Sequence, residues 1–130
     1  MKLDNDLVLV VEDDADTLEL IRIVLEYALG VRVVTGENGI DALHQAEDAQ
    51  PALILLDMML PGMDGLEVAK RLRSSPRSQN TPIVAVTASA SREMATAAGC
   101  NDFIQKPFQL DYLLSKVREH LPSHVQAAHC

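Results

Sequence analysis

With 130 residues, the chain matches one ordinary domain, and a second folded domain does not fit within it. Hydrophobic residues make up 48% of the chain and charged residues 23%, which is typical of a soluble globular protein. Acidic residues outnumber basic ones by 19 to 11, so we expect no nucleic-acid binding by this domain, because contacts to phosphates need clustered Lys and Arg.

The longest apolar runs, such as residues 7–11 and 52–56, are far below the roughly 18 residues that a membrane span requires. The first residues do not resemble a signal peptide. Cys100 and Cys130 have neither a metal-type nor a disulfide-type spacing, which fits a reducing compartment. We therefore expect a cytoplasmic protein that does not interact with a membrane.

The first predicted strand is the unbroken apolar run from Leu7 to Val11, a pattern typical of strands covered on both faces. Three carboxylates follow it directly: Glu12, Asp13 and Asp14.

A helical pattern runs from Asp16 to Leu29, and Gly30 is its stop signal. One apolar stripe of this helix is expected to face the core: Leu20, Ile21, Val24, Leu25 and Ala28. Leu18, Ile23 and Tyr27 lie outside that stripe. We expect these three residues either to flank the core or to mark a docking face.

The rest of the chain continues this alternation. Further strands are predicted over residues 31–35, 53–56, 83–87 and 103–105, and further helices over about 40–49, 66–72, 91–98 and 110–121. Five strands alternating with five helices through short loops imply an α/β fold, a (βα)5 doubly wound five-stranded parallel sheet in a three-layer sandwich. Residues 1–121 are predicted to form this domain, and residues 122–130 a C-terminal tail.

Asp57 stands at the end of the most apolar predicted strand, and Pro61, Gly62 and Gly65 then break any regular structure. An ionised carboxylate in a buried position is costly unless something neutralises it. Ligands of open parallel sheets bind outside the carboxyl ends of the strands, so Asp57 is a candidate functional residue. The alternative is an aspartate that merely caps the following turn.

Four of the five predicted strands end in polar groups, namely Glu12 with Asp13, Asp57, Thr87 and Lys106. All of these groups should meet at one edge of the sheet. At an effective dielectric near 20, two carboxylates about 4 Å apart repel by about 4 kcal/mol, and a divalent cation removes that cost. Oxygen ligands with only one or two carboxylates suit Mg²⁺, which is the expected cofactor.

This set of groups also suits phosphoryl transfer to a carboxylate. Asp57 is the expected nucleophile and would form an aspartyl phosphate. Lys106 and the metal would offset charge on the phosphoryl oxygens, while Thr87 would donate a hydrogen bond.

From about Leu7 to Leu121, the chain resembles the receiver domain of two-component response regulators, a flavodoxin-like fold. The matching residues are Glu12, Asp13, Asp57, Pro61, Gly65, Thr87, Ala88, Lys106, Pro107 and Phe108. The resemblance implies that Asp57 takes a phosphoryl group from a phosphohistidine of a sensor histidine kinase or a histidine phosphotransfer protein. It also implies a signalling domain that promotes only its own phosphorylation and dephosphorylation, and is not otherwise an enzyme.

The resemblance further implies that Mg²⁺ is bound by Asp13, Asp57 and the backbone carbonyl of Met59, with Glu12 acting mainly through water. Thr87 and Lys106 would contact the phosphoryl group. The peptide bond before Pro107 would be cis, which proline makes accessible.

Phe103 matches the aromatic switch position of the family. The resemblance implies that Thr87 moves toward the phosphate and the ring turns inward, which changes the face made by the fourth helix, fifth strand and fifth helix. The alternative is that Phe103 is ordinary core. The stretch from Thr87 to Gly99 is about one helical turn shorter than is usual in the family, so we expect a short or displaced fourth helix.

Four residues occupy positions where the family meets its phosphodonor helices: Asp14, Ala15, Leu18 and Arg22. Of these, Leu18 is also one of the three apolar residues outside the core-facing stripe. A charge at Leu18 is therefore expected to slow phosphoryl transfer from a protein donor, but not labelling by a small phosphodonor.

Other functions remain open. One is a flavodoxin-like interaction module whose site is never phosphorylated. A haloacid-dehalogenase-like phosphatase would need a second aspartate two residues after Asp57, where Met59 stands. A metal site made by His124, His129 and Cys130 competes with a solvated tail. The sequence is compatible with a stand-alone receiver and with a piece of a longer protein.

Overall fold

The computed structural model describes residues 6–88 and 91–122, in which strands and helices alternate. The strands are β1 (Leu7–Val11), β2 (Arg32–Gly36), β3 (Leu53–Leu56), β4 (Ile83–Thr87) and β5 (Asp102–Gln105). The helices are α1 (Ala15–Leu29), α2 (Gly39–Ala49), α3 (Gly65–Ser74), α4 (Arg92–Ala97) and α5 (Leu110–His120). All the predicted elements are confirmed, with small differences at their ends.

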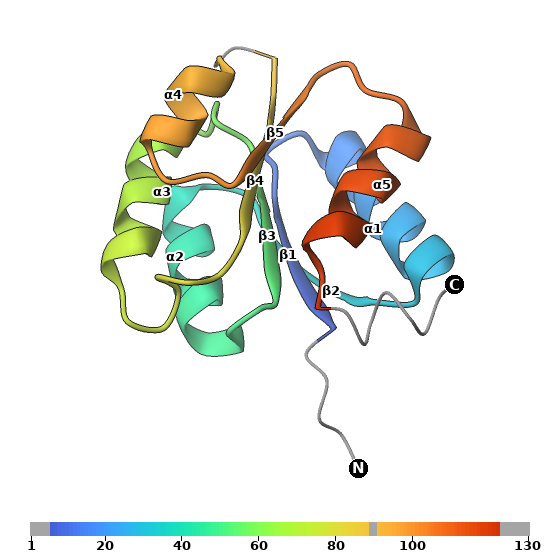
Figure 1. Ribbon diagram of the computed structural model, residues 1–130, viewed down its shortest axis with the longest axis horizontal. Coiled ribbons are helices and arrows are strands. Elements are labelled where there is room, and N and C mark those ends of the chain that lie inside the picture. The colour runs from blue at the N-terminus through green and yellow to red at the C-terminus, as the bar shows by residue number, and fades with distance from the viewer. Residues whose placement is uncertain (1–5, 89–90, 123–130) are drawn as a thin grey trace.

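The strands form one parallel sheet in the order β2-β1-β3-β4-β5. Helices α1 and α5 cover one face, and α2, α3 and α4 cover the other (Figure 1). The doubly wound three-layer fold is therefore confirmed. No helix in the described part of the chain is long and apolar enough to cross a membrane.

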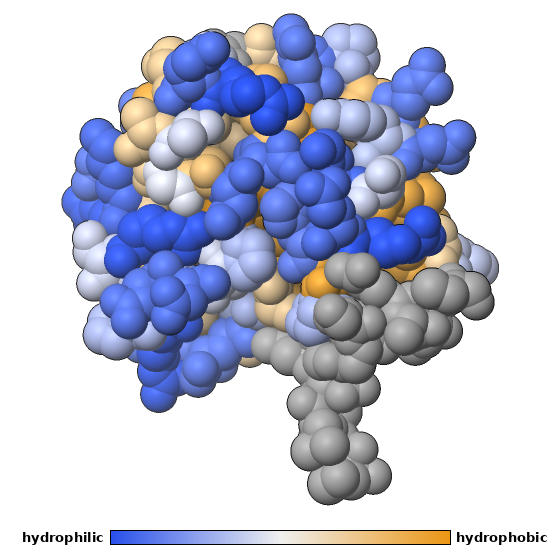
Figure 2. All heavy atoms as spheres, viewed as in Figure 1, coloured by the Kyte–Doolittle hydropathy of each residue, from blue (hydrophilic) through white to orange (hydrophobic). Residues whose placement is uncertain are grey.

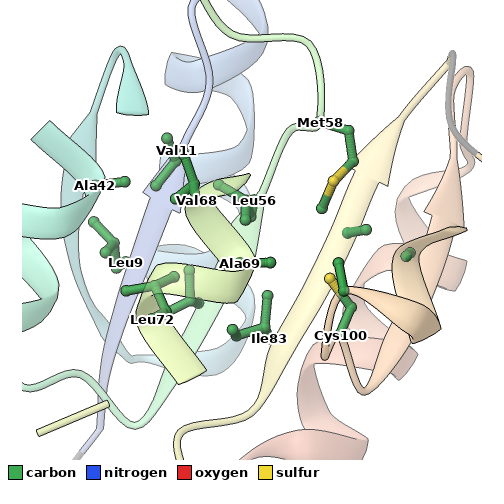
Figure 3. Close-up of a cluster of buried hydrophobic side chains, with 14 of the residues drawn as sticks. Leu9, Val11, Ala42, Leu56, Met58, Val68, Ala69, Leu72, Ile83 and Cys100 are labelled. Atoms are coloured by element: carbon green, nitrogen blue, oxygen red, sulfur yellow. The ribbon is translucent and has the colours of Figure 1, made fainter. Parts of the chain in front are cut away.

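The two covered faces explain why β1 is apolar at every position. Val8 and Val10 point into the core beneath α1 and α5. Leu9 and Val11 point the other way, into the cluster beneath α2 and α3 that Figure 3 shows. Because neighbouring side chains of a strand face opposite sides, only a strand buried on both faces needs this unbroken pattern.

Local signals set where the helices begin and end. Asp14 caps α1, because its carboxylate accepts a hydrogen bond from Thr17 N at 2.9 Å. Gly30 ends α1 with a positive φ of 68°, a conformation that glycine adopts without strain. Helix α4 has six residues, which confirms the prediction of a short fourth helix.

The buried face of α1 differs from the prediction. Leu18 is 9% exposed and packs in the core, whereas Leu20 is 46% exposed. The placement of Leu20 in the core-facing stripe is therefore wrong, and for Leu18 the alternative of a residue at the core applies. Ile23 and Tyr27 are exposed. The buried residues of α1 are 18, 21, 25 and 29. They have helical spacing, as the predicted stripe does, so only packing against β1 and α5 decides which stripe is buried.

The C-terminal tail predicted for residues 122–130 lies outside the described residues, apart from Pro122. The alternative metal site of His124, His129 and Cys130 lies outside them as well.

Candidate functional site

The polar groups that follow β1, β3 and β5 meet at one edge of the sheet. The Lys106 ammonium nitrogen lies 2.5 Å from Glu12 Oε1 and 2.9 Å from Asp57 Oδ2. These residues are far apart in the sequence, so only the parallel sheet brings them together. The predicted convergence of these strand ends is thereby confirmed.

Backbone hydrogen bonds extend the sheet by one residue and hold these side chains in place. Asp57 N donates to Val11 O at 3.0 Å, and Lys106 N donates to Thr87 O at 3.0 Å. Thr87 is the last residue of β4 and is fully buried at the same edge. The polar residues are therefore positioned by the strands rather than by mobile loops.

A tight turn follows Asp57. Met59 N donates to Asp57 Oδ1 at 2.9 Å, which orients the carboxylate, and the Met59 side chain itself is exposed. Gly65 lies against Met58, so that a Cβ at Gly65 would stand 2.4 Å from Met58 Cα. The glycine that the sequence marks only as a strand breaker is thus required because two backbone segments approach closely here.

Burial sets the electrostatics of the site. Glu12 is 2% exposed and Asp57 is 4% exposed. Burial raises the pKa of the Glu12 carboxyl above its ordinary value, and the hydrogen bond from Lys106 offsets part of that effect. Burial also tends to lower the pKa of Lys106, but its hydrogen bonds to Glu12 and Asp57 outweigh this and raise it.

The carboxylates of the site fit a divalent cation. One oxygen of each of Glu12, Asp13 and Asp57 lies within 4.8 Å of the others. Three carboxylates face one ammonium group, so the site carries an excess of negative charge. Closely spaced oxygen ligands with uncompensated charge are the donor set that Mg²⁺ prefers.

A second charged cluster was not predicted from the sequence. Asp102, at the start of β5, accepts hydrogen bonds from Lys116 at 3.0 Å and pairs with His120 at 2.9 Å. Arg92 lies 3.3 Å from its other oxygen. Asp102, Glu119 and His120 also have ligand atoms within 4.8 Å of one another, but the cations already neutralise Asp102.

The remaining predicted residues are placed as follows. Phe103 is buried in the cluster beneath α4, and the Lys106–Pro107 bond is cis, as predicted. Asp14 and Ala15 are exposed at the start of α1. Arg22 forms ion pairs with Glu19 and Glu26 of its own helix.

Comparison with known proteins gives a consistent result. Residues 8–118 match the family model of the response regulator receiver domain. The chain is 37% identical over 117 residues to the uncharacterized transcriptional regulatory protein YkoG of Bacillus subtilis, covering 88% of this chain and 50% of YkoG. It is 34% identical to the polar-differentiation response regulator DivK of Brucella anthropi, covering 88% of this chain and 94% of DivK.

Solved structures agree with this. The receiver domain of the sensor histidine kinase PA1611 from Pseudomonas aeruginosa, with a magnesium ion in its active-site cleft, aligns with a TM-score of 0.81 and 33% identity. That alignment covers 88% of this chain and 96% of that one. Chemotaxis response regulator CheY4 of Vibrio cholerae aligns with a TM-score of 0.82 and 30% identity, covering 88% and 98%.

Proposed function

This chain belongs to the response regulator receiver domain family, and on that premise we propose that Asp57 accepts a phosphoryl group from a phosphohistidine. The main support is the Lys106 ammonium group, which bridges Glu12 and Asp57 at the carboxyl ends of the strands. The donor would be a sensor histidine kinase or a histidine phosphotransfer protein. The receiver is a signalling domain, and its own chemistry is limited to this aspartate.

In the proposed reaction, a carboxylate oxygen of Asp57 attacks the phosphorus atom of the donor. The new O–P bond forms as the P–N bond to the imidazole breaks, and the ring nitrogen leaves with the electron pair and takes up a proton. Lys106, 2.9 Å from Asp57 Oδ2, is close enough to stabilise negative charge on the phosphoryl oxygens. Thr87 would donate a hydrogen bond to the same group.

We propose Mg²⁺ as the cofactor, held by Asp13, Asp57 and the backbone carbonyl of Met59, with Glu12 acting through water. The three carboxylates that approach within 4.8 Å support this, as does the magnesium ion in the PA1611 receiver domain. When bound, the metal supplies positive charge that offsets the repulsion between the carboxylates and the incoming phosphoryl group.

Phosphorylation is proposed to act on partners through Thr87 and Phe103. Thr87 ends β4 beside the site, and Phe103 lies in the neighbouring strand, buried beneath α4. A new charged group that draws Thr87 toward it would change the packing around the ring, and with it the α4–β5–α5 face. The absence of nucleic-acid binding and the cytoplasmic location remain predictions.

The test is phosphorylation by acetyl phosphate in the presence of Mg²⁺, followed by intact-mass measurement. We expect the wild type to gain one phosphoryl group and Asp57→Asn to gain none. Asp64→Asn, which alters an exposed carboxylate that caps α3, is the matched control and should react normally. A phosphorylated Asp57→Asn protein, or an unreactive wild type, would contradict the proposal; the latter would favour a silent interaction module.

We further propose that the phosphodonor docks beside α1. Asp14 and Ala15 are exposed there, but Leu18 is in the core and Arg22 is held by two glutamates. Leu20 is one of the exposed apolar residues of α1, and it lines an open pocket that also contains Lys106, Phe108 and Leu110. We therefore assign to Leu20 the apolar contact that the sequence suggested for Leu18.

Leu20→Glu should slow transfer from a cognate protein donor about tenfold or more, because it places a charge in a desolvated contact. Labelling by acetyl phosphate should be unchanged. Tyr27→Glu is the control, because Tyr27 lies two turns further along α1 and is 88% exposed. Equal losses with both donors would contradict this docking surface.

A further inference from the structure

Arg92, the first residue of α4, contacts two consecutive residues of β5. Its Nη1 atom lies 3.3 Å from Asp102 Oδ1. Its guanidinium carbon lies 5.7 Å from the centre of the Phe103 ring, within the range of a cation–π contact. Arg92 thus connects the short α4 helix both to a charged residue and to the aromatic ring of the proposed switch.

Asp102 provides a fixed anchor for Arg92. Its side chain is almost fully buried, and its carboxylate also accepts a hydrogen bond from Phe103 N at 2.8 Å. Lys116 and His120 hold it from α5. Burial alone would raise the pKa of the Asp102 carboxyl, but the hydrogen bonds from His120 and Lys116 lower it far below its ordinary value. Asp102 therefore stays ionised. Its ion pair with Arg92 holds the Arg92 side chain against β5.

The Phe103 ring packs against buried residues on one side and borders an open pocket on the other. The ring is buried with residues of α4 such as Ala95. It also lines an open pocket with Arg92, Gln105 and Phe108. Figure 2 shows this face, over α4, β5 and α5, where hydrophilic residues cover most of the middle. A cation above the ring opposes its movement out of the buried position, because the contact is lost when the ring leaves.

We propose that Arg92 is a positioning residue for the switch: by bridging Asp102 and the Phe103 ring, it stabilises the buried ring and so favours binding of the phosphoryl group at Asp57. This inference rests on the proposed function, in which the inward ring accompanies phosphorylation. Two sites that share one conformational equilibrium affect each other reciprocally. A contact that holds the ring inside must therefore strengthen binding at Asp57.

The test compares the affinity of the full chain for beryllofluoride, a phosphoryl mimic, in the presence of Mg²⁺. Arg92→Gln should bind it about fivefold more weakly, the effect expected for losing one exposed ion pair and one cation–π contact. Arg92→Lys keeps the charge and should stay within about twofold of the wild type. Arg71→Gln is the matched control, because Arg71 is likewise 56% exposed and ion-paired but contacts no ring among the described residues.

A second measurement follows the ring itself. The chain contains two phenylalanines, so labelling with fluorophenylalanine gives two ¹⁹F resonances, and Phe108→Tyr identifies that of Phe103. Arg92→Gln should shift or broaden the Phe103 resonance without any ligand. An Arg92→Gln protein that binds beryllofluoride as tightly as the wild type would overturn the inference alone. A wild type that does not bind it at Asp57 would overturn the proposed function, and the inference with it.

Discussion

The two ends of β5 carry charged clusters of opposite balance. At the carboxyl end, one cation, Lys106, faces the carboxylates of Glu12, Asp13 and Asp57. At the amino end, one buried carboxylate, Asp102, faces several basic side chains from α4 and α5. Both clusters bring three potential metal ligands within 4.8 Å of one another.

The difference shows that ligand spacing alone does not make a metal site. Around Asp102, Arg92 and Lys116 supply the positive charge, so a metal ion would have to displace them. Around Asp57, a single ammonium group leaves carboxylates uncompensated. A site that is short of positive charge can gain stability from a cation, whereas a neutralised ion-pair network cannot.

The largest expected effect comes from removing the single cation of the first cluster. Lys106→Ala should lower the free energy of unfolding by about 3 kcal/mol in EDTA, because it leaves two buried carboxylates without the ammonium group that balances their charge. Mg²⁺ should restore much of this loss by binding the folded state. Urea denaturation with EDTA and with Mg²⁺ measures both.

Lys116→Ala is the matching change at the other end of β5. Asp102 keeps Arg92 and His120 there, so the loss should be smaller and unaffected by Mg²⁺. A Lys106→Ala protein that is no less stable than Lys116→Ala would remove the basis of the comparison.

An intermediate effect is expected for Asp102→Asn. Its loss leaves Lys116 and His120 without their buried counter-charge, although both reach solvent, so we expect a cost of roughly 2 kcal/mol. Urea denaturation should give the same loss with and without Mg²⁺. Glu119→Gln, which alters an exposed carboxylate beside Lys116, should change stability by less than about 0.5 kcal/mol. Rescue of Asp102→Asn by Mg²⁺ would speak against two independent clusters.

The smallest effect is a difference in pH dependence. The pKa of Glu12 is raised in the folded protein, so its contribution to stability is present at low pH and is lost as pH rises through the raised pKa. The pKa of Asp102 is lowered, so its contribution is present above about pH 4 and is lost as pH falls further.

In EDTA, the stability of Glu12→Gln relative to the wild type should therefore increase as pH rises. The stability that Asp102→Asn loses relative to the wild type should become smaller as pH falls below about 4. Urea midpoints measured over a pH series check both trends. If the urea midpoints of the two variants changed with pH in the same way, the two clusters would not have opposite charge balances.

Much of the fold and of the site follows from local sequence signals. The apolar run before Asp57, the capping residue Asp14 and the stop at Gly30 act on their immediate neighbours, so the elements that they delimit are predictable. The alternation of strands and helices implies parallel strands, and these bring Glu12, Asp57, Thr87 and Lys106 to one edge whatever the details of packing.

The sequence by itself therefore determined the order of the elements and the strand-end groups, because turn residues and hydrophobic periodicity act over a few neighbouring residues. Only the tertiary structure decided that Leu18 rather than Leu20 faces the core, since this depends on how α1 is rotated against β1 and α5. It also decided that Arg92 reaches Asp102 and Phe103, because the contact joins separate elements whose relative position no local pattern records.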